Sequence, residues 1–391
     1  MKTIYLDHSA TTPVDPRVLE AMLPFLQEQW GNPSSVYSMA REAKKAVEDA
    51  REQVALLIGA EPSEIVFTSG GTESDNIVLR GIARANQKKG KHIITSAIEH
   101  HAILHTVEDL GKAGFEVTYL PVDKYGMVSV ADLEQAIRPD TILISIMYAN
   151  NEIGTIQPIK ELGRIAKERG IIFHTDAVQA VGYLDIDVMQ EHIDLLSLSG
   201  HKIYGPKGIG ALFIRKGVKM APLMTGGGQE RKWRPGTENV PGIVGLGKAA
   251  QLAREEREKR NNHLRKLRDQ LIDGVVAKID HVRVNGHLEQ RLPGNAHFAF
   301  EFIEGESLLL NLDREGIAGS SGSACSSGSL EPSHVLLAIG MPHEIAHGSL
   351  RLTLGKDNTE AEIKRVIEVL PPIVQKLRAM SPLYDKHKVG G

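Results

Sequence analysis

Short apolar runs alternate with amphipathic stretches between residues 64 and 214, and this alternation constrains the fold more than any other feature of the sequence. Runs of this kind that are separated by helices are typical of a mostly parallel sheet covered by helices on both faces. We therefore predict an α/β fold with a mostly parallel, seven-stranded sheet. The predicted strands are 65–67, 92–95, 117–120, 142–145, 171–174, 195–198 and 211–214, and the clearest helices are 72–85, 101–113 and 159–169.

The chain changes in character after this region. A mostly charged stretch, 254–269, lies within a helical pattern that continues to about 278. Its mixed signs favour a solvated helix that links two domains over a nucleic-acid-binding face. A strand-like segment, two helices and a Gly/Ser-rich loop follow and predict a smaller α+β domain, with the strand at 295–302 and the helices at 307–314 and 359–378. We assign 15–255 to a large domain, 1–14 and 256–385 to a small domain, and 386–391 to a disordered tail.

The charge balance excludes several classes of protein. Lys and Arg number 46 and Asp and Glu number 49, for a net charge of −3. Such a balance argues against a protein that binds nucleic acid or a membrane surface, since these usually carry excess positive charge. No apolar run reaches the ~18 residues of a membrane helix, and the polar, acidic start does not resemble a signal peptide. We expect a cytoplasmic protein.

Two sequence features resemble binding sites, one for a nucleotide and one for a metal, but neither has the residues that such a site requires. The segment 242–249 is close to a nucleotide-binding P-loop, but no Ser or Thr follows Lys248 to hold Mg²⁺ and no apolar strand precedes it. A helix with small packing residues explains it better. The 16 histidines include no zinc-type spacing with a following ligand, which makes a metalloenzyme an unattractive interpretation.

Polar residues at the ends of three predicted strands suggest a site. The turn 68–74 (Thr-Ser-Gly-Gly-Thr-Glu-Ser) opens a helix, and the backbone N–H groups of such a turn can hold phosphate. Asp176 follows the strand 171–174, and burying its charge there costs free energy unless the carboxylate meets a cation. Lys202 follows the strand 195–198, where a desolvated amine favours Schiff-base chemistry. An Asp, a Lys and a phosphate-binding helix start at one sheet edge together imply pyridoxal phosphate.

Cys325 is the only cysteine of the chain. It excludes an intramolecular disulfide and any multi-cysteine metal site within a single chain, so an iron–sulfur cluster could use Cys325 only together with a partner chain. A lone cysteine is often a buried apolar residue. The surrounding segment 316–328 is rich in Ser and Gly, however, and favours a reactive thiol on a loop.

Longer motifs resemble a known family. The segments 199–208 and 68–76 are similar to those of fold-type-I pyridoxal-phosphate enzymes of the aminotransferase class V group, and 319–327 resembles the active-site segment of group I cysteine desulfurases (NifS/IscS-like). The resemblance extends from Tyr5 to about Leu383. One departure is His8-Ser9, where many relatives have Asn-Ala. Relatives with housekeeping roles also carry a longer carboxyl tail that docks a scaffold protein, so a NifS-like role is favoured here.

The resemblance implies a role for each residue of the site. Lys202 would hold pyridoxal 5′-phosphate covalently, Asp176 would keep its ring nitrogen protonated, and His100 would stack on the ring and shuttle protons. Substrate would be held by Arg351 through its carboxylate, with Asn32 and Asn151 assisting. The remaining cofactor contacts would come from Gly71, Thr72, Asn151, Gln179, Ser199, His201 and, from the partner subunit of a homodimer, Thr237.

The implied reaction converts L-cysteine to L-alanine. Cys325 would hold the sulfur as a persulfide and pass it to an iron–sulfur scaffold protein or to another acceptor for thiolation. Two alternatives remain: another pyridoxal-phosphate enzyme of the same fold, such as an aminotransferase or a selenocysteine lyase, and a non-catalytic interaction protein. Transamination needs no thiol, and an interaction protein would not need Lys202, Asp176, His100 and Cys325 together.

Overall fold

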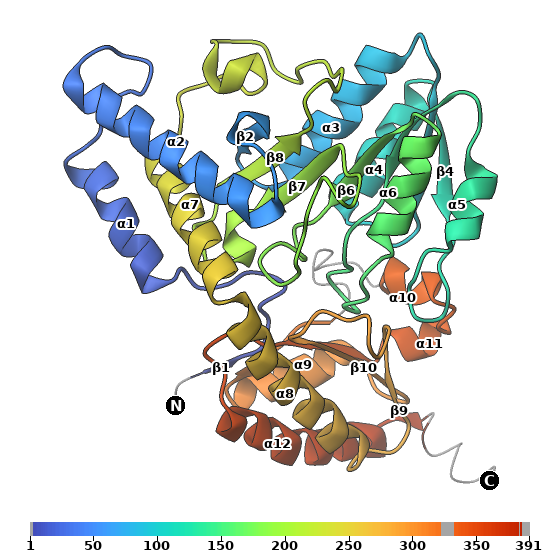
Figure 1. Cartoon of the computed structure of the whole chain (residues 1–391). Coiled ribbons are helices and arrows are strands. Elements are labelled where there is room, and N and C mark those ends of the chain that lie inside the picture. Colours follow the sequence, from blue (N-terminus) through green and yellow to red (C-terminus); the bar gives the residue numbers. More distant parts are fainter. Residues whose placement is uncertain (1–2, 322–331, 383, 385–391) are drawn as a thin grey trace.

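The computed structural model describes residues 3–321, 332–382 and 384. Cys325 and its neighbours therefore lie outside the described residues. Figure 1 shows two regions: a large region above, built on the main sheet with helices α1 to α7, and a small region below, which contains helices α8 to α12 and strands β1 and β9 to β12. Both ends of the described chain lie in the small region.

The large region is organised by a seven-stranded sheet in the order β2-β8-β7-β6-β5-β3-β4. All seven predicted strands are confirmed, each within two residues at either end. Only β8 runs antiparallel to its neighbours, so the sheet is mostly parallel, as predicted. The strands are β2 (Ile65–Thr68), β3 (His92–Ser96), β4 (Glu116–Leu120), β5 (Thr141–Ser145), β6 (Ile172–Asp176), β7 (Leu195–Ser199) and β8 (Gly210–Ile214).

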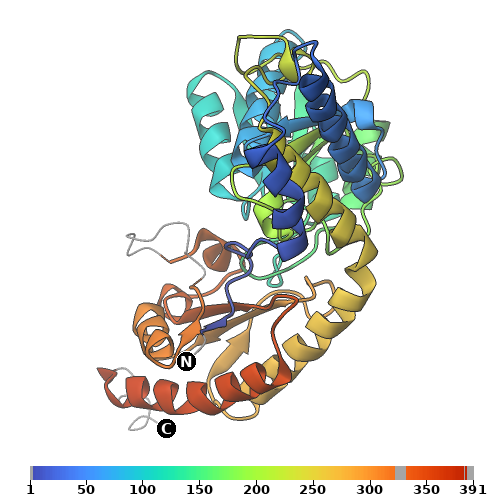
Figure 2. The same ribbon diagram turned by 90° about the vertical axis from the view of Figure 1, so that its left-hand side faces the viewer.

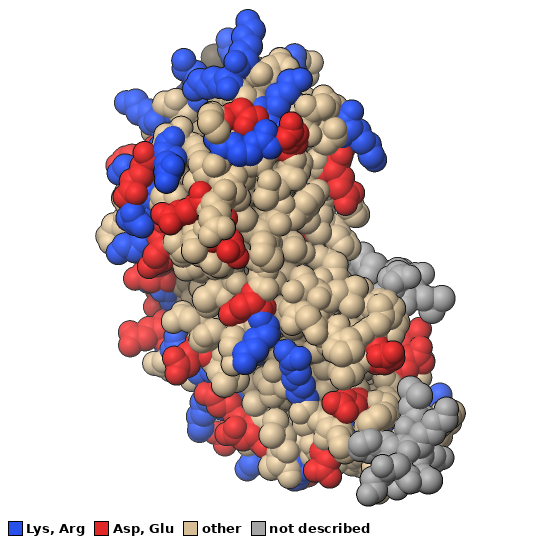
Figure 3. All heavy atoms as spheres, turned by 90° about the vertical axis from the view of Figure 1, so that its right-hand side faces the viewer, with Lys and Arg blue, Asp and Glu red and all other residues tan. Residues whose placement is uncertain are grey.

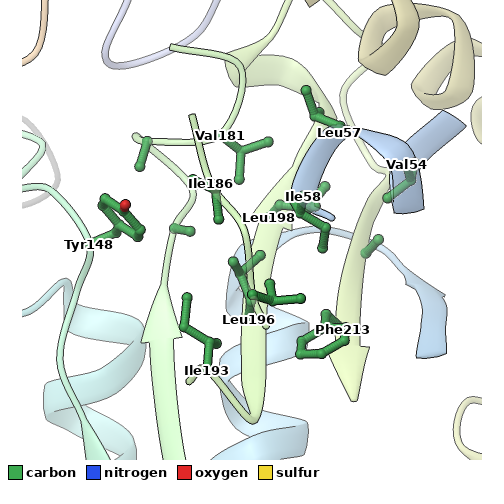
Figure 4. Packing of buried hydrophobic residues seen from close by; sticks show 14 of the residues in the cluster. Val54, Leu57, Ile58, Tyr148, Val181, Ile186, Ile193, Leu196, Leu198 and Phe213 are labelled. Carbon is green, nitrogen blue, oxygen red and sulfur yellow. The ribbon is translucent and has the colours of Figure 1, made fainter. Parts of the chain in front are cut away.

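Helices cover both faces of this sheet because alternate strand residues are buried on opposite sides. Leu196 and Phe213 belong to the core under α2, α5, α6 and α7, whereas Leu195 and Leu212 belong to the core under α3 and α4. Figure 4 shows Val54, Leu57 and Ile58 of α2 near Leu196, Leu198 and Phe213 of the first core. The helices are α1 (Pro16–Gln27), α2 (Ser38–Ile58), α3 (Gly71–Asn86), α4 (His101–Lys112), α5 (Val130–Ala136), α6 (Ile159–Glu168) and α7 (Val240–Glu255).

The P-loop-like segment 242–249 lies inside α7, as the packing interpretation predicts. Gly247 sits against α2 so closely that a Cβ there would come within 2.5 Å of Ala50. Gly247 therefore allows α7 to approach α2 closely. The predicted linking helix differs in its bounds: α7 ends at Glu255, and α8 (Arg257–Val276) begins after a break at Glu256. In the side view of Figure 2, these two helices follow one another and join the two regions, and α8 lies along one edge of the small region.

The small region is built on a three-stranded antiparallel sheet, β12-β10-β9, packed against α8 and α12. The amino-terminal strand joins this region: β1 pairs in parallel with β11, and Leu6 is fully buried in its core. The elements are β1 (Ile4–Tyr5), β9 (Val282–Val284), β10 (Asn295–Phe300), α9 (Gly305–Arg314), β11 (Ile317–Ala318), α10 (His334–Ala338), α11 (His343–Ala346), β12 (Ser349–Thr353) and α12 (Glu360–Ala379).

Charge is unevenly distributed over the surface. Figure 3 shows Lys and Arg gathered over the end of the large region that is farthest from the small region, while both signs are mixed elsewhere on this face. No helix within the described residues combines the length and the apolar character that crossing a membrane requires.

Candidate active site

The ends of β2, β6 and β7 define the site. β2 and β7 are both antiparallel to β8, so they run in the same direction, and their last residues, Thr68 and Ser199, both lie opposite Gly210. A Cβ at Gly210 would lie 2.7 Å from the Cα of Gly70. Glycine at this position therefore lets the turn after β2 approach the end of β7.

The turn after β2 fits a phosphate group. Gly70 precedes α3 with a φ of 151° and offers no side chain to cap the first N–H groups of the helix. A Cβ at Gly71 would lie 2.7 Å from Cγ2 of Val178, so only glycine allows the helix start to approach the end of β6. An uncapped helix start carries a partial positive charge that favours an anion. The Ser199 Oγ lies beside this turn, 3.6 Å from the Cβ position of Gly70.

Lys202 and Asp176 lie at the same edge and influence each other electrostatically. The Lys202 Nζ, in the short helix after β7, donates to the carbonyl oxygens of Ala10 (2.8 Å) and Ser9. Burial raises the pKa of Asp176 to about 6, against the Val178 N–H bond and the charge of Lys202, which lower it. A buried carboxylate in this position is stabilised by a cation, and the protonated ring nitrogen of pyridoxal phosphate is such a partner.

His100 precedes α4 and is neutral near pH 7. Burial and, after it, the charge of Lys202 lower its pKa to about 4, which indicates that the two side chains are close. The His100 Nδ1 accepts a hydrogen bond from the Ala102 N–H at 3.1 Å. The neutral ring therefore carries its proton on Nε2. From that atom it can donate to a developing negative charge.

A layer of buried ionisable groups beside Asp176 has no role in the sequence prediction. His174, on the same strand, is fully buried, and its ring nitrogens bond to the hydroxyls of Ser145 (2.9 Å) and Ser197 (3.1 Å). Burial and the neighbouring charge of Asp176 raise the pKa of Asp75, so Asp75 holds a proton and Asp176 is the ionised member of the pair. The available signal was an Asp on the apolar face of the predicted helix 72–85.

Arg351 approaches the site from β12 of the small region. Its guanidinium is nearly buried and is held by the Asp7 carboxylate (Nη2 to Oδ1, 2.9 Å) and by the Asn151 carbonyl oxygen (Nη1, 3.1 Å). Its backbone exchanges two hydrogen bonds with Ser320, at 2.6 and 3.1 Å. Arg351 therefore connects the turn that carries Asn151 to the start of the segment that contains Cys325. No role for Asp7 follows from the sequence.

The other predicted site residues are placed as follows. Gln179 donates to the Ser9 carbonyl oxygen at 2.9 Å, an acceptor that it shares with Lys202. His201 bonds through Nδ1 to the Thr11 hydroxyl at 3.1 Å. Thr237 and Ser69 line the same hollow of about 230 Å³. Asn32, between α1 and α2, is exposed and accepts from the Ser34 N–H at 2.9 Å, so its substrate role stays a prediction.

A metal centre is not found in the part of the chain that the structure describes, where no three His, Cys, Asp or Glu side chains are arranged to hold an ion. Cys325 lies outside those residues. The described site consists of a turn suited to a phosphate, an amine, a buried carboxylate, an imidazole and a guanidinium.

Comparison with known proteins identifies the family. Residues 4–366 match the family model described as aminotransferase class-V. The chain belongs to this family. Class V aminotransferases are pyridoxal-phosphate enzymes, and the cofactor of this chain is pyridoxal 5′-phosphate. The site fits it: Lys202 would bind its aldehyde carbon, Asp176 its ring nitrogen, and the turn at Gly71 and Thr72 its phosphate.

Several class V relatives are similar over nearly their whole length. The cysteine desulfurase IscS of Methanosarcina thermophila is 65% identical, with 98% of this chain and 95% of the relative covered. That of Clostridium botulinum strain Hall is 60% identical, with 99% and 98% covered. A solved NifS-like protein has a TM-score of 0.90 at 42% identity, with 96% of this chain and 100% of the other covered. A structure described as SspA in complex with cysteine has a TM-score of 0.80 at 40% identity, with 91% and 100% covered. The predicted resemblance to group I cysteine desulfurases and the fold are confirmed.

Proposed function

We propose that this enzyme is a cysteine desulfurase that converts L-cysteine to L-alanine and holds the sulfur as a persulfide on Cys325. The observation that carries the proposal is the position of Arg351. Its guanidinium is suited to a carboxylate, lies on the chain segment bonded to Ser320, and contacts the turn of Asn151. Relatives at 60–65% identity are named cysteine desulfurases, and one similar structure is described as a complex with cysteine.

The chain's own residues would share the chemistry as follows. The bound cofactor supplies an electron sink next to the substrate Cα. Lys202 holds the cofactor and moves the Cα proton, while Asp176 stabilises the positive charge on the ring nitrogen. Arg351, assisted by Asn32 and Asn151, orients the substrate through its carboxylate, and Gln179, Ser199 and His201 hold the cofactor.

The sulfur transfer step would require Cys325 as a thiolate. Its Sγ attacks the substrate Sγ, so that a new S–S bond forms and the substrate Cβ–S bond breaks. The electron pair of the broken bond stays with the substrate carbon, which takes up a proton and leaves as alanine. The His100 Nε2–H would stabilise the negative charge on sulfur during this exchange.

The expected partners also remain proposals. A homodimer is supported by apolar side chains that are exposed around α1, among them Leu26 (56%) and Trp30 (72%), and would allow Thr237 to reach the partner's phosphate site. An iron–sulfur scaffold protein or another thiolation acceptor would take the sulfur, and Cys325 could ligate a transferred cluster together with such a partner. The division into 15–255 and 1–14 with 256–385 is supported by two large hydrophobic cores, one within 15–255 apart from Leu292 and one within 1–14 and 256–385, although a smaller cluster contains residues of both ranges. The cytoplasmic location stays a prediction.

An absorption spectrum of the purified protein before and after addition of L-cysteine tests the proposal. We expect a band at the edge of the visible range that shifts with cysteine, together with one alanine for each sulfur released. L-selenocysteine is assayed in parallel to distinguish a selenocysteine lyase. The matched variant, Cys325→Ser, should lose turnover of cysteine. A spectral shift without sulfur release would contradict the proposal and indicate a class V enzyme of other specificity.

A further inference from the structure

A turn of unusual backbone conformation lies between β8 and α7. Three successive residues, Glu230, Arg231 and Lys232, have φ values of 43°, 54° and 71°. Side chains with a Cβ adopt this left-handed region at a cost, and three in a row require that the surrounding structure hold them. The turn leads directly to Arg234 and Thr237.

Buried charges hold the turn in place against β2. The Arg51 guanidinium makes two bonds of 2.8 Å to the Glu230 carboxylate, and both side chains are about 95% buried. Glu230 also accepts from the Phe67 N–H at 2.8 Å. Arg231 donates to carbonyl oxygens of residues 62–65, including that of Ser63 at 2.7 Å. The path of the chain toward Thr237 is therefore determined by contacts with β2 and with the residues just before it.

Glu73 links this segment to the phosphate-binding turn. It is the third residue of α3, and its two carboxylate oxygens have different partners. Oε1 accepts from the Arg234 Nε at 2.9 Å, and Oε2 accepts from the backbone N–H of Ser69 at 2.7 Å. The Arg234 side chain is 29% exposed and that of Glu73 is 13% exposed. Ser69, Arg234 and Thr237 also line one hollow of about 230 Å³.

The position of Glu73 creates an electrostatic problem that Arg234 solves. A carboxylate in the first turn of α3 lies close to the helix start where a phosphate would bind, and two negative groups repel each other. Arg234 compensates the charge of Glu73, and Glu73 can then hold the Ser69 N–H without opposing the phosphate. An arginine suits this role because it stays charged and directs its N–H groups in a fixed geometry.

We propose that Glu73 and Arg234 are a positioning pair for the cofactor phosphate, in which Glu73 orients the phosphate-binding turn and Arg234 removes the repulsion that Glu73 would otherwise exert. This inference rests on the proposed role of the turn at Gly71 and Thr72. Neither residue touches the phosphate in the proposed arrangement. Both act through the turn.

The test compares pyridoxal phosphate with pyridoxal, which lacks the phosphate, in spectroscopic titrations of the apoprotein. Arg234→Met should weaken pyridoxal phosphate binding by about tenfold and leave pyridoxal binding unchanged, because an uncompensated carboxylate repels only the phosphate. Glu73→Gln should have a smaller effect. The double variant should bind pyridoxal phosphate more tightly than Arg234→Met alone, since the repelling charge is gone.

The matched control is Arg80→Met. Arg80 lies on the same helix as Glu73, away from the turn, and the substitution removes its 2.7 Å ion pair with Asp109. It should change neither affinity. Should Arg234→Met fold poorly by circular dichroism, Arg234→Lys keeps the charge but not the geometry and should retain most of the affinity for pyridoxal phosphate.

Two results would overturn the inference: an equal loss of affinity for both aldehydes, which would indicate a general structural role, or a double variant no better than Arg234→Met. Failure of the proposed function looks different. In that case the wild-type protein would still bind both aldehydes but would release no sulfur from L-cysteine.

Discussion

The two regions of the molecule contribute different parts of the proposed site. The large region supplies the residues for the cofactor, at the ends of β2, β6 and β7 and at the start of α4. The small region supplies Arg351 and connects to the segment of Cys325 through Ser320. Cofactor binding and substrate chemistry should therefore be separable by mutation, although the two groups of residues meet at one edge.

Their interiors also differ in how they treat buried charge. Around the cofactor residues, burial raises the pKa of Glu99 to about 8 and that of Asp176 to about 6, so near pH 7 Glu99 holds a proton and Asp176 is ionised. Around Arg351, the buried charge is paired with Asp7 and with a backbone carbonyl oxygen. In the first environment the ionised Asp176 can pair with a cationic group, and in the second Arg351 can bind an anion.

The largest effect that we expect comes from the large region. Lys202→Ala should lower cysteine turnover by at least about 10⁴-fold, because in the proposed mechanism the amine both binds the cofactor and moves the proton. The cofactor absorption band should be lost or shifted in the same variant. Turnover near the wild-type rate, measured as alanine formed, would contradict the assignment of Lys202.

Cys325→Ser tests the other side of the comparison. It should reduce sulfur release by at least about 10³-fold, because a hydroxyl is a far weaker nucleophile than a thiolate. The cofactor band should remain as in the wild type, since the cofactor residues lie in the large region. Loss of the band in this variant would show that the two groups of residues are not separable.

Arg351→Lys should have a smaller effect of a different kind. We expect kcat/KM for L-cysteine to fall by about 100-fold, mainly through KM, because lysine cannot form the bidentate bond to a carboxylate. Titration of the apoprotein with pyridoxal phosphate provides the control and should give the wild-type affinity. A fall in kcat alone would argue against carboxylate binding at this position.

Glu152→Gln should have the smallest effect, on stability, and this effect should develop as the pH rises from about 5 to about 7. Burial raises the pKa of Glu152 to about 7, although a hydrogen bond from Ser333 and the charge of Arg351 lower it. A carboxyl group whose pKa is raised on folding contributes stability below its unfolded pKa and loses it as the pH rises through the folded value.

The variant should therefore match the wild type at pH 5 and exceed its free energy of unfolding by about 2 kcal/mol at pH 8. Urea denaturation at both pH values provides the measurement. The exposed substitution Glu134→Gln is the control and should show no such change between the two pH values.

The sequence predicts the large region better than the small one, and the reason is burial. Most strands of the large sheet are buried along their whole length because helices cover both faces, as in β5 (Thr141–Ser145), and only the edge strand β4 is largely exposed. In the small region, β9 is only partly buried, and β12 contains Ser349 and Arg351, so neither has the pattern of a buried strand. The break at Glu256 also gave no signal, since charged residues continue on both sides of it.

Within the site, the sequence identifies residues that follow predicted strands, such as Asp176 and Lys202, because the apolar strand before each of them can be recognised locally. It does not identify Asp7, His174 or Arg234. Each acquires its meaning from a partner in space: Asp7 from Arg351, His174 from Ser145 and Ser197, and Arg234 from Glu73.

The sequence alone therefore determined the class of fold, the seven strands of the main sheet, the family and the residues that resemble its active site. These are local or motif-based properties, since apolar periodicity and turn residues act over a few positions. Only the tertiary structure decided that Thr68 and Ser199 meet across Gly210, that Asp7 holds Arg351 and that Glu73 joins two loops. Such contacts depend on how segments far apart in the chain pack together, and a pattern that extends over a few residues carries no information on that packing.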